Sequence, residues 1–318
     1  MADTVHGWSP RLRRNRLHDA LLTSSAARGL HQALRRRSTI AFLMCLPLIV
    51  IIACLVIYPA LYSIYLSMLN KAQTRFIGLG NFSFLLSRDV FWMVVQQSAI
   101  FALTAVFFKA LIGLITAHLI NNLPTKGQRK WRGMLLVPWV IPLALSSLGW
   151  WWLFDPTHSA FNYILASFGH HEIAWLSNPY WARFSVILVN IWYGAPFFLI
   201  MYLAALKSVP EQLYEAAAID GAGRLRRFRY ITLPAIGPAL LAVACLVTIG
   251  SLRAFDVIFA LTQGGPLNST NVLPLLSYQT SFQEFDFGRG AAIGSFAFLI
   301  VFAVALVYVR TLRLEQPT

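Results

Sequence analysis

The stretch EAAAIDGAGRLRRFRYITLP (residues 215–234) lies between two apolar runs, at about 183–206 and 235–261. It holds two carboxylates and four arginines, and it ends in a proline. Each flanking run is longer than the roughly 20 apolar residues that a helix needs to cross a bilayer. The pattern therefore predicts a charged loop that joins two transmembrane helices.

The whole chain has the composition of a polytopic all-α membrane protein. It has 318 residues, of which 58% are hydrophobic and 12% charged, and its mean hydropathy is +0.62. A soluble domain of this length needs more charged surface. The three cysteines lie inside apolar runs, which predicts no disulfide framework. We expect six transmembrane helices, at about 40–69, 92–120, 133–153, 183–206, 235–261 and 291–310.

The basic residues predict the orientation. If the N-terminus is cytoplasmic, the segments 1–39, 121–132, 207–234 and 310–318 carry 19 of the 26 Lys and Arg residues, whereas the exported segments carry 5. This asymmetry fits the positive-inside rule and predicts that both termini are cytoplasmic. The charge of +14 then reflects topology, and no nucleic-acid partner is expected.

The sequence predicts a basic cytoplasmic tail (1–39), a six-span transmembrane domain (40–310, with the loop 207–234) and a short C-terminal tail (311–318). The first tail holds eight arginines and precedes an apolar run too long for a cleaved signal peptide. Its leucines form no clean helical stripe, so both a membrane-surface helix and a disordered tail remain open.

Catalytic and metal-binding motifs are missing from the sequence. There is no G-x-x-x-x-G-K-[ST] phosphate cradle, no H-E-x-x-H and no G-x-S-x-G. The six runs contain one carboxylate, Asp256, and one histidine, His118. We therefore expect no catalytic residue, no metal and no cofactor in this chain. His170, His171 and Glu172, with His158 upstream, are adjacent residues that point in different directions, so a solvated loop is favoured over a metal site.

Within the charged loop, the segment 210–219 predicts a helix that begins at Pro210. Asp220-Gly221 should end it, because glycine readily takes the left-handed conformation. A second helix is expected over 224–230, stopped by Pro234 before the next span. Alanines leave the first helix small enough to enter a groove of another protein. An ordinary positive-inside loop is the alternative.

The residues of this loop resemble the EAA loop of ATP-binding-cassette (ABC) importer permeases. In that family the loop is a coupling helix that docks into a cleft of the ATPase subunit. The resemblance implies ATPase-coupling roles for Glu215, Ala216, Ala217, Asp220, Gly221 and Phe228.

The resemblance covers most of the chain and points to the maltose/glycerol-phosphate group of carbohydrate permeases, on the MalF- or UgpA-like side of a permease pair. Its landmarks are FIGLGNFSFLL (76–86), LVPWVIP (136–142), NIWYGAPFF (190–198) and FDVIFALTQGGP (255–266). It implies the type I importer fold in the bacterial inner membrane. The implied partners are a second permease subunit, two copies of an ATPase that binds ATP and Mg, and an extracytoplasmic solute-binding protein.

Aromatic and polar residues inside the fourth run predict a solute cavity. Sugars stack on aromatic faces and bind amides and hydroxyls. Asn190, Tyr193, Gly194 and Phe197 share one helical face, and Trp192 lies beside them. Interhelical packing is the alternative. The resemblance adds Trp139 and a looser match at Ser251, so the predicted substrate-binding residues are Trp139, Asn190, Tyr193, Gly194, Phe197, Ser251 and Arg253.

Two cations within the runs, Arg253 and Lys109, are left with two interpretations each. Arg253 could bind an acidic or phosphorylated solute, or it could pair with Asp256 on one face of the fifth helix. Lys109 could snorkel to the interface or contact a sister subunit.

The sequence thus predicts an importer permease for a carbohydrate that works by alternating access. A stand-alone secondary transporter or channel would leave the alanine-rich helix without a role. A membrane-embedded enzyme would need a catalytic cluster, and a permease for a peptide or amino acid would not explain the landmarks.

Overall fold

The computed structural model describes residues 37–157 and 159–314, and this part of the chain consists of helices and loops without a β-strand. The chain divides into two compact units, residues 1–62 and 63–318. Most of the two predicted tails, and also His158, lie outside the described residues. The all-α membrane fold predicted from the composition is confirmed.

One long apolar helix fills the described part of the first unit. It comprises α2 (Arg37–Ile52), a π-helical turn (Ala53–Ile57) and α3 (Tyr58–Ser67), which extends into the second unit. Residues 40–67 are long and apolar enough to cross a membrane, as the run at 40–69 predicts.

The second unit contains the other described helices. In chain order they are α4 (Gly80–Leu86), α5 (Asp89–Asn121), α6 (Thr125–Leu135), α7 (Val137–Val140), α8 (Leu143–Leu153), α9 (Ala160–Ser167), α10 (Pro179–Lys207), α11 (Glu211–Ile219), α12 (Arg224–Arg227), a π-helical turn (Phe228–Thr232), α13 (Leu233–Leu252), α14 (Asp256–Leu261), α15 (Leu273–Tyr278), a π-helical turn (Gln279–Gln283) and α16 (Phe287–Leu314).

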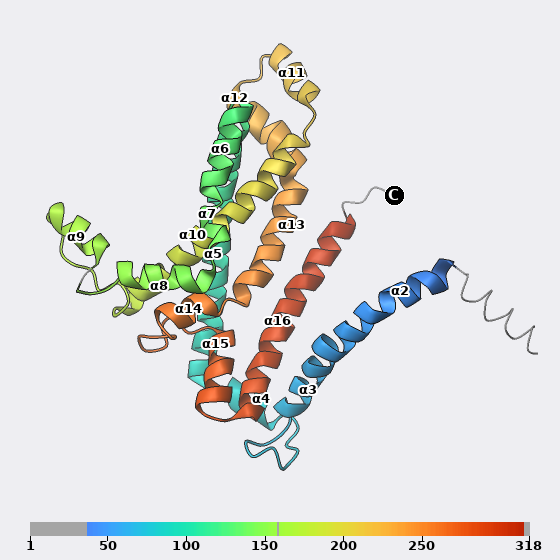
Figure 1. Ribbon diagram of the computed structural model, residues 1–318, viewed down its shortest axis with the longest axis vertical. Coiled ribbons are helices and arrows are strands. Elements are labelled where there is room, and N and C mark those ends of the chain that lie inside the picture. The colour runs from blue at the N-terminus through green and yellow to red at the C-terminus, as the bar shows by residue number, and fades with distance from the viewer. Residues whose placement is uncertain (1–36, 158, 315–318) are drawn as a thin grey trace, which may run out of the picture. The chain divides into compact units, whose positions relative to one another are not determined.

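The helices α5, α10 and α13 pack side by side and form the centre of this unit (Figure 1). Their shared core includes the buried residues Ala117, Phe198, Tyr202 and Ile236. At Gly113 of α5, an added Cβ would collide with Phe198 and with the backbone of α10. Glycine is therefore what allows the two helices to approach this closely.

An aromatic cluster holds the segment between α8 and α10. Phe154, Phe161 and Trp175 pack together, and the buried Asn162 accepts hydrogen bonds from the Trp175 indole (2.9 Å) and from the Ile173 backbone N–H (3.1 Å). The neighbouring residues 170–172 are all exposed, as expected for a solvated loop.

The third apolar run is not one helix, which corrects the prediction of a continuous span at 133–153. Three short helices, α6, α7 and α8, occupy it, and the chain turns sharply between α7 and α8 (Figure 1). Ile141 is extended (φ −74°, ψ 132°) because the following Pro142 disfavours helical backbone there. Among the described residues, five helices are long and apolar enough to cross a membrane.

The fifth span is displaced toward the charged loop. A helical segment runs from Arg224 to Leu252, so Pro234 does not stop the helix as predicted, and the span ends nine residues before residue 261. The π-helical turn at 228–232 ends two residues before Pro234 and re-registers the backbone hydrogen bonds where the proline has no N–H to donate. Beyond Leu252 the backbone leaves the helix and resumes as α14.

The GLGNF landmark has a structural role at the end of α3. The amide of Asn81 is buried and donates to two backbone carbonyl oxygens, those of Ser67 (2.9 Å) and Leu69 (2.7 Å). These carbonyls follow the last turn of the helix and have no helical partner. Asn81 therefore fixes the connection from α3 into α4.

We predict that Asn81→Ala lowers the free energy of unfolding by about 1–3 kcal/mol, because two buried carbonyls lose their donor. Thermal unfolding of the purified protein in detergent measures the loss. Asn122→Ala is the matched control, since Asn122 is exposed and also donates to a backbone carbonyl, that of His118 (3.0 Å). Similar melting temperatures for the two variants would contradict this role of Asn81.

Candidate functional site

A cavity of about 490 Å³ lies between α5, α10 and α13, and residues of α7, α8 and α14 also line it. This volume is within the range of small-molecule sites. The cavity brings together all seven residues that the sequence predicts to bind solute: Trp139, Asn190, Tyr193, Gly194, Phe197, Ser251 and Arg253. They come from three separate segments of the chain: α7, α10 and the end of α13.

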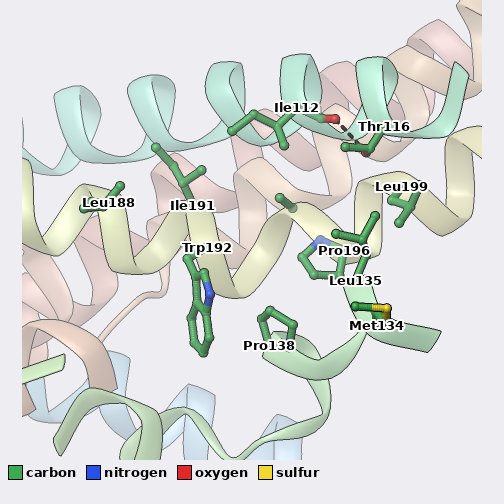
Figure 2. Close-up of a pocket in the computed structure, with 11 residues that line it drawn as sticks. Ile112, Thr116, Met134, Leu135, Pro138, Leu188, Ile191, Trp192, Pro196 and Leu199 are labelled. Carbon is green, nitrogen blue, oxygen red and sulfur yellow. Dashed lines mark hydrogen bonds between the residues drawn. The ribbon is translucent and has the colours of Figure 1, made fainter. Parts of the chain in front are cut away.

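Two different faces of helix α10 line two different cavities. Asn190, Tyr193, Gly194 and Phe197 face the first cavity. Trp192 and Pro196 line a second, apolar cavity of about 360 Å³ with residues of α5, α6 and α7 (Figure 2). The sequence names Trp192 as a cavity or interhelical residue beside this face, and the structure places it at the second cavity. A one-residue step turns a helix by about 100°, so Trp192 lies on a different face from Tyr193.

Lys109 is the most unusual residue of the first cavity. It lies near the middle of α5, is only 4% exposed, and donates a hydrogen bond from Nζ to the Ser251 hydroxyl (3.3 Å). A Cβ at Gly194 would lie 2.6 Å from Lys109 Cε. The lysine chain therefore crosses α10 at the one position that has no side chain, and it neither snorkels to the interface nor faces outward to a sister subunit.

The cavity also offers groups that suit a carbohydrate. Trp139 and Phe197 form a tilted aromatic pair with ring centroids 5.8 Å apart. Asn190 is 6% exposed, and its Oδ1 accepts no hydrogen bond from the described residues. An unpaired buried amide oxygen is costly, so this atom is available to a hydroxyl donor.

Arg253 and Asp256 do not form the helical pair that the sequence left open. The helix ends at Leu252, and Arg253 is its C-terminal cap, while Asp256 begins α14. Both side chains are exposed and line the cavity, and among the described residues no ion pair joins them within 4.0 Å. The break in the helix is what separates them.

The predicted loop helix is α11, which projects beyond the end of α10 (Figure 1). Asp220 caps it, and Gly221 has the left-handed conformation (φ 75°). The N–H of Gly221 donates to Ala218 O (3.1 Å), and the N–H of Ala222 donates to Ala217 O (2.9 Å). These two bonds form a Schellman motif, so the predicted glycine ending is confirmed.

The surface of α11 is open. Glu215 and Ala216 are exposed, and Ile219 is 88% exposed. The Tyr214 hydroxyl lies 2.9 Å from the Thr232 hydroxyl, which joins α11 to the start of α13. Contiguous exposed apolar surface on such an element is typical of a protein contact.

Phe228 lies apart from this open surface. Its ring packs edge-on against His118 of α5, with centroids 5.4 Å apart. The structure thus places five of the six predicted coupling residues on α11 and its C-terminal turn, and Phe228 at the junction with the helical bundle.

The sequence did not assign Lys109 to the cavity. A lysine at the middle of an apolar run was the available signal, but snorkelling and outward contact fit it equally well. Only the packing of Gly194 against the lysine chain decides between them.

The fold and the two sites define a membrane subunit of a transport system, and comparison with known proteins identifies the family. Residues 109–314 match the family described as binding-protein-dependent transport system inner membrane component. This chain belongs to that family.

Two relatives and one solved structure illustrate the similarity. The trehalose/maltose transport system permease protein MalF of Thermococcus litoralis is 33% identical, over 88% of this chain and 96% of its own length. The sulfoquinovosyl glycerol transport system permease protein SmoG of Agrobacterium fabrum is 33% identical, over 87% and 91%. A chain of a bacterial ABC transporter involved in the import of the acidic polysaccharide alginate shares the fold, with a TM-score of 0.79 and 24% identity, over 91% of this chain and 99% of that chain.

We predict that Gly194→Ala destabilises the protein by about 1–3 kcal/mol, because the added methyl overlaps the Lys109 chain. Thermal unfolding of the purified variants measures this loss of stability. In a Lys109→Ala background the same substitution should cost at least about 0.5 kcal/mol less.

Gly250→Ala is the control, since Gly250 also lines the cavity but an added Cβ would meet nothing within 4 Å. A cost of Gly194→Ala that does not depend on residue 109 would contradict the contact.

Proposed function

We propose that this chain is the membrane-spanning permease subunit of an ABC importer for carbohydrates. The observation that carries the proposal is the combination, in a chain of this family, of a polar and aromatic cavity with an exposed coupling-type helix. The relatives named for trehalose/maltose and for sulfoquinovosyl glycerol support a carbohydrate solute.

The cavity is the proposed solute site. Trp139 and Phe197 supply aromatic faces for sugar rings, and Asn190 and Tyr193 supply hydrogen-bonding groups beside them. These polar groups lie between helices and are shielded from lipid, which is where groups on a transport pathway are tolerated.

Helix α11 is the proposed docking element for a separate ATPase subunit, which binds and hydrolyses ATP with Mg. The sequence of this chain has no phosphate cradle of its own. Three residues separate α11 from α10, and the Schellman turn joins it to the helical segment that becomes α13. Because α10 and α13 form two walls of the cavity, a rigid movement of α11 would be passed directly to them. This coupling supports alternating access.

The remaining features of the proposal concern partners and topology. A second, homologous permease subunit would complete the pathway, two ATPase copies would drive it, and an extracytoplasmic binding protein would deliver solute. The basic residues around α6 and α12 support a cytoplasmic position for α11 and for both termini.

Purification of the tagged chain from its native membrane tests the assignment. We expect a P-loop ATPase and a second permease to co-purify in stoichiometric amounts, and ATP hydrolysis by the complex. An active, monodisperse monomer without an ATPase would contradict the proposal and would instead support a stand-alone secondary transporter or channel.

We predict that Gly221→Pro and Glu215→Lys each reduce the amount of co-purified ATPase about tenfold, the equivalent of about 1.4 kcal/mol of binding energy. Proline cannot adopt the positive φ of residue 221 and removes its N–H donor. Glu215→Lys reverses a charge on the open surface of α11. Quantitative immunoblotting of the purified complex measures the ATPase retained.

Glu284→Lys is the matched control, because Glu284 is also exposed but lies in the loop before α16. Membrane insertion should be unchanged in all three variants. Full ATPase retention in both loop variants would remove the docking role of α11.

A further inference from the structure

The charges of the cavity are unbalanced around Lys109. Two cations, Lys109 and Arg253, and one carboxylate, Asp256, line it. No carboxylate of the described residues lies within 4.0 Å of the lysine ammonium, and its one hydrogen bond is to the Ser251 hydroxyl. An ammonium has three donors, so part of the hydrogen-bonding capacity of this side chain, which is only 4% exposed, is unused.

A buried cation within a transmembrane helix is costly unless an opposite charge or several polar groups compensate it. A purely structural tether between α5 and α13 would not need a charge, since a neutral side chain could also bond Ser251. The glycine at position 194 leaves room for the outer part of the lysine chain, and the ammonium lies 3.3 Å from the Ser251 hydroxyl in a cavity that Asn190 also lines.

We propose that the cavity takes a carbohydrate that carries an acidic group, a carboxylate, sulfonate or phosphate, and that Lys109 is the specificity-determining residue that faces this group. This inference rests on the proposed function, because it assigns the charge of the solute in the same cavity. Arg253 contributes a second positive charge at an exposed position, and Asp256 lowers the net attraction without cancelling it.

The neutral part of the solute would meet the aromatic and amide groups. Trp139 and Phe197 offer ring faces, and the unpaired Asn190 Oδ1 accepts from a hydroxyl. The cavity therefore has a charged end at Lys109 and a sugar-binding wall on α7 and α10, which matches a sugar acid better than a simple inorganic anion.

The cavity potential can be measured without knowing the natural solute. In the assembled transporter, with Cys45, Cys54 and Cys245 of this chain replaced by alanine, Gly250→Cys puts a thiol in the cavity at a position with no neighbour within 4 Å. The probes are a sulfonate-bearing and a trimethylammonium-bearing methanethiosulfonate. Their labelling rates, read from the intact mass of this chain, are each divided by the rate with free mercaptoethanol.

We expect the sulfonate reagent to react faster than the ammonium reagent. Lys109→Met should lower the ratio of the two rates roughly tenfold or more, as a unit charge a few ångströms away in a medium of effective dielectric about 20 predicts. Asp256→Asn should raise the ratio. Lys71→Met, which removes an exposed lysine outside the cavity, should leave it unchanged. A ratio near one, or a ratio that does not respond to Lys109→Met, overturns the proposal.

A second arm of the experiment tests the solute class. Methyl β-D-glucuronide and methyl β-D-glucoside, which differ by a carboxylate, are added at equal concentrations to protect Gly250→Cys from the uncharged reagent methyl methanethiosulfonate. We expect stronger protection by the glucuronide, and loss of the difference in Lys109→Met. Equal protection, protection by neither sugar, or preference for the glucoside overturns the acidic-solute inference.

Failure of this inference is distinguishable from failure of the proposed function. If ATP and Mg change the labelling rate of Gly250→Cys while no anion preference is found, alternating access is supported and the inference of an acidic solute is wrong. If no ATPase accompanies the chain and ATP has no effect on labelling, the importer assignment itself falls.

Discussion

The close crossing of α5 and α10 is the contact on which the cavity depends. Two glycines make it possible, one on each helix. Gly113 of α5 lies against Phe198 of α10, and Gly194 of α10 lies against Lys109 of α5. In each helix the two residues involved are four apart, one turn along the same face. The packing is thus reciprocal, and it brings the lysine ammonium into the interior where an ordinary helix crossing would exclude it.

The same crossing orients α10 so that its two faces serve different purposes. One face carries Asn190 and Tyr193 into the polar cavity, while Trp192 and Pro196 face an apolar one. The breaks in the neighbouring segments complete the site. Pro142 interrupts the third apolar run beside Trp139, and the end of α13 releases Arg253 and Asp256 from helical register. Irregular backbone in a membrane protein is tolerated where it is buried in protein or lines a cavity, and the backbone from Arg253 to Asp256 lines this one.

The loop after α10 shows which structural features can be predicted from neighbouring residues alone. A short helix with a left-handed ending is predicted from its alanines, its proline start and Asp220-Gly221. The structure has this ending, with the two Schellman hydrogen bonds. The prediction succeeds because helix ends are decided by residues within a turn of each other. The prediction for Pro234 is wrong. A proline usually ends a helix, yet the π-helical turn before it accommodates the missing N–H, in a segment where Phe228 also packs against His118 of α5.

The seven predicted cavity residues do lie together, although composition and spacing support only the four on α10. Trp139 and Ser251 came from the family resemblance, whereas Arg253 was included for its charge within an apolar run. Arg253 and Asp256 show the limit of spacing arguments, since a separation of three implies a shared face only while the helix continues.

Local signals in the sequence define an all-α membrane protein, four of its six predicted spans and the loop between the fourth and fifth, since hydropathy, charge asymmetry and helix-end signals are local. The tertiary structure alone decided that the third apolar run is broken, that Trp192 and Tyr193 face different cavities, and that Lys109 points inward. A side chain's direction in a membrane helix depends on which neighbour leaves room for it, and that room is provided by a glycine 85 residues away in the chain.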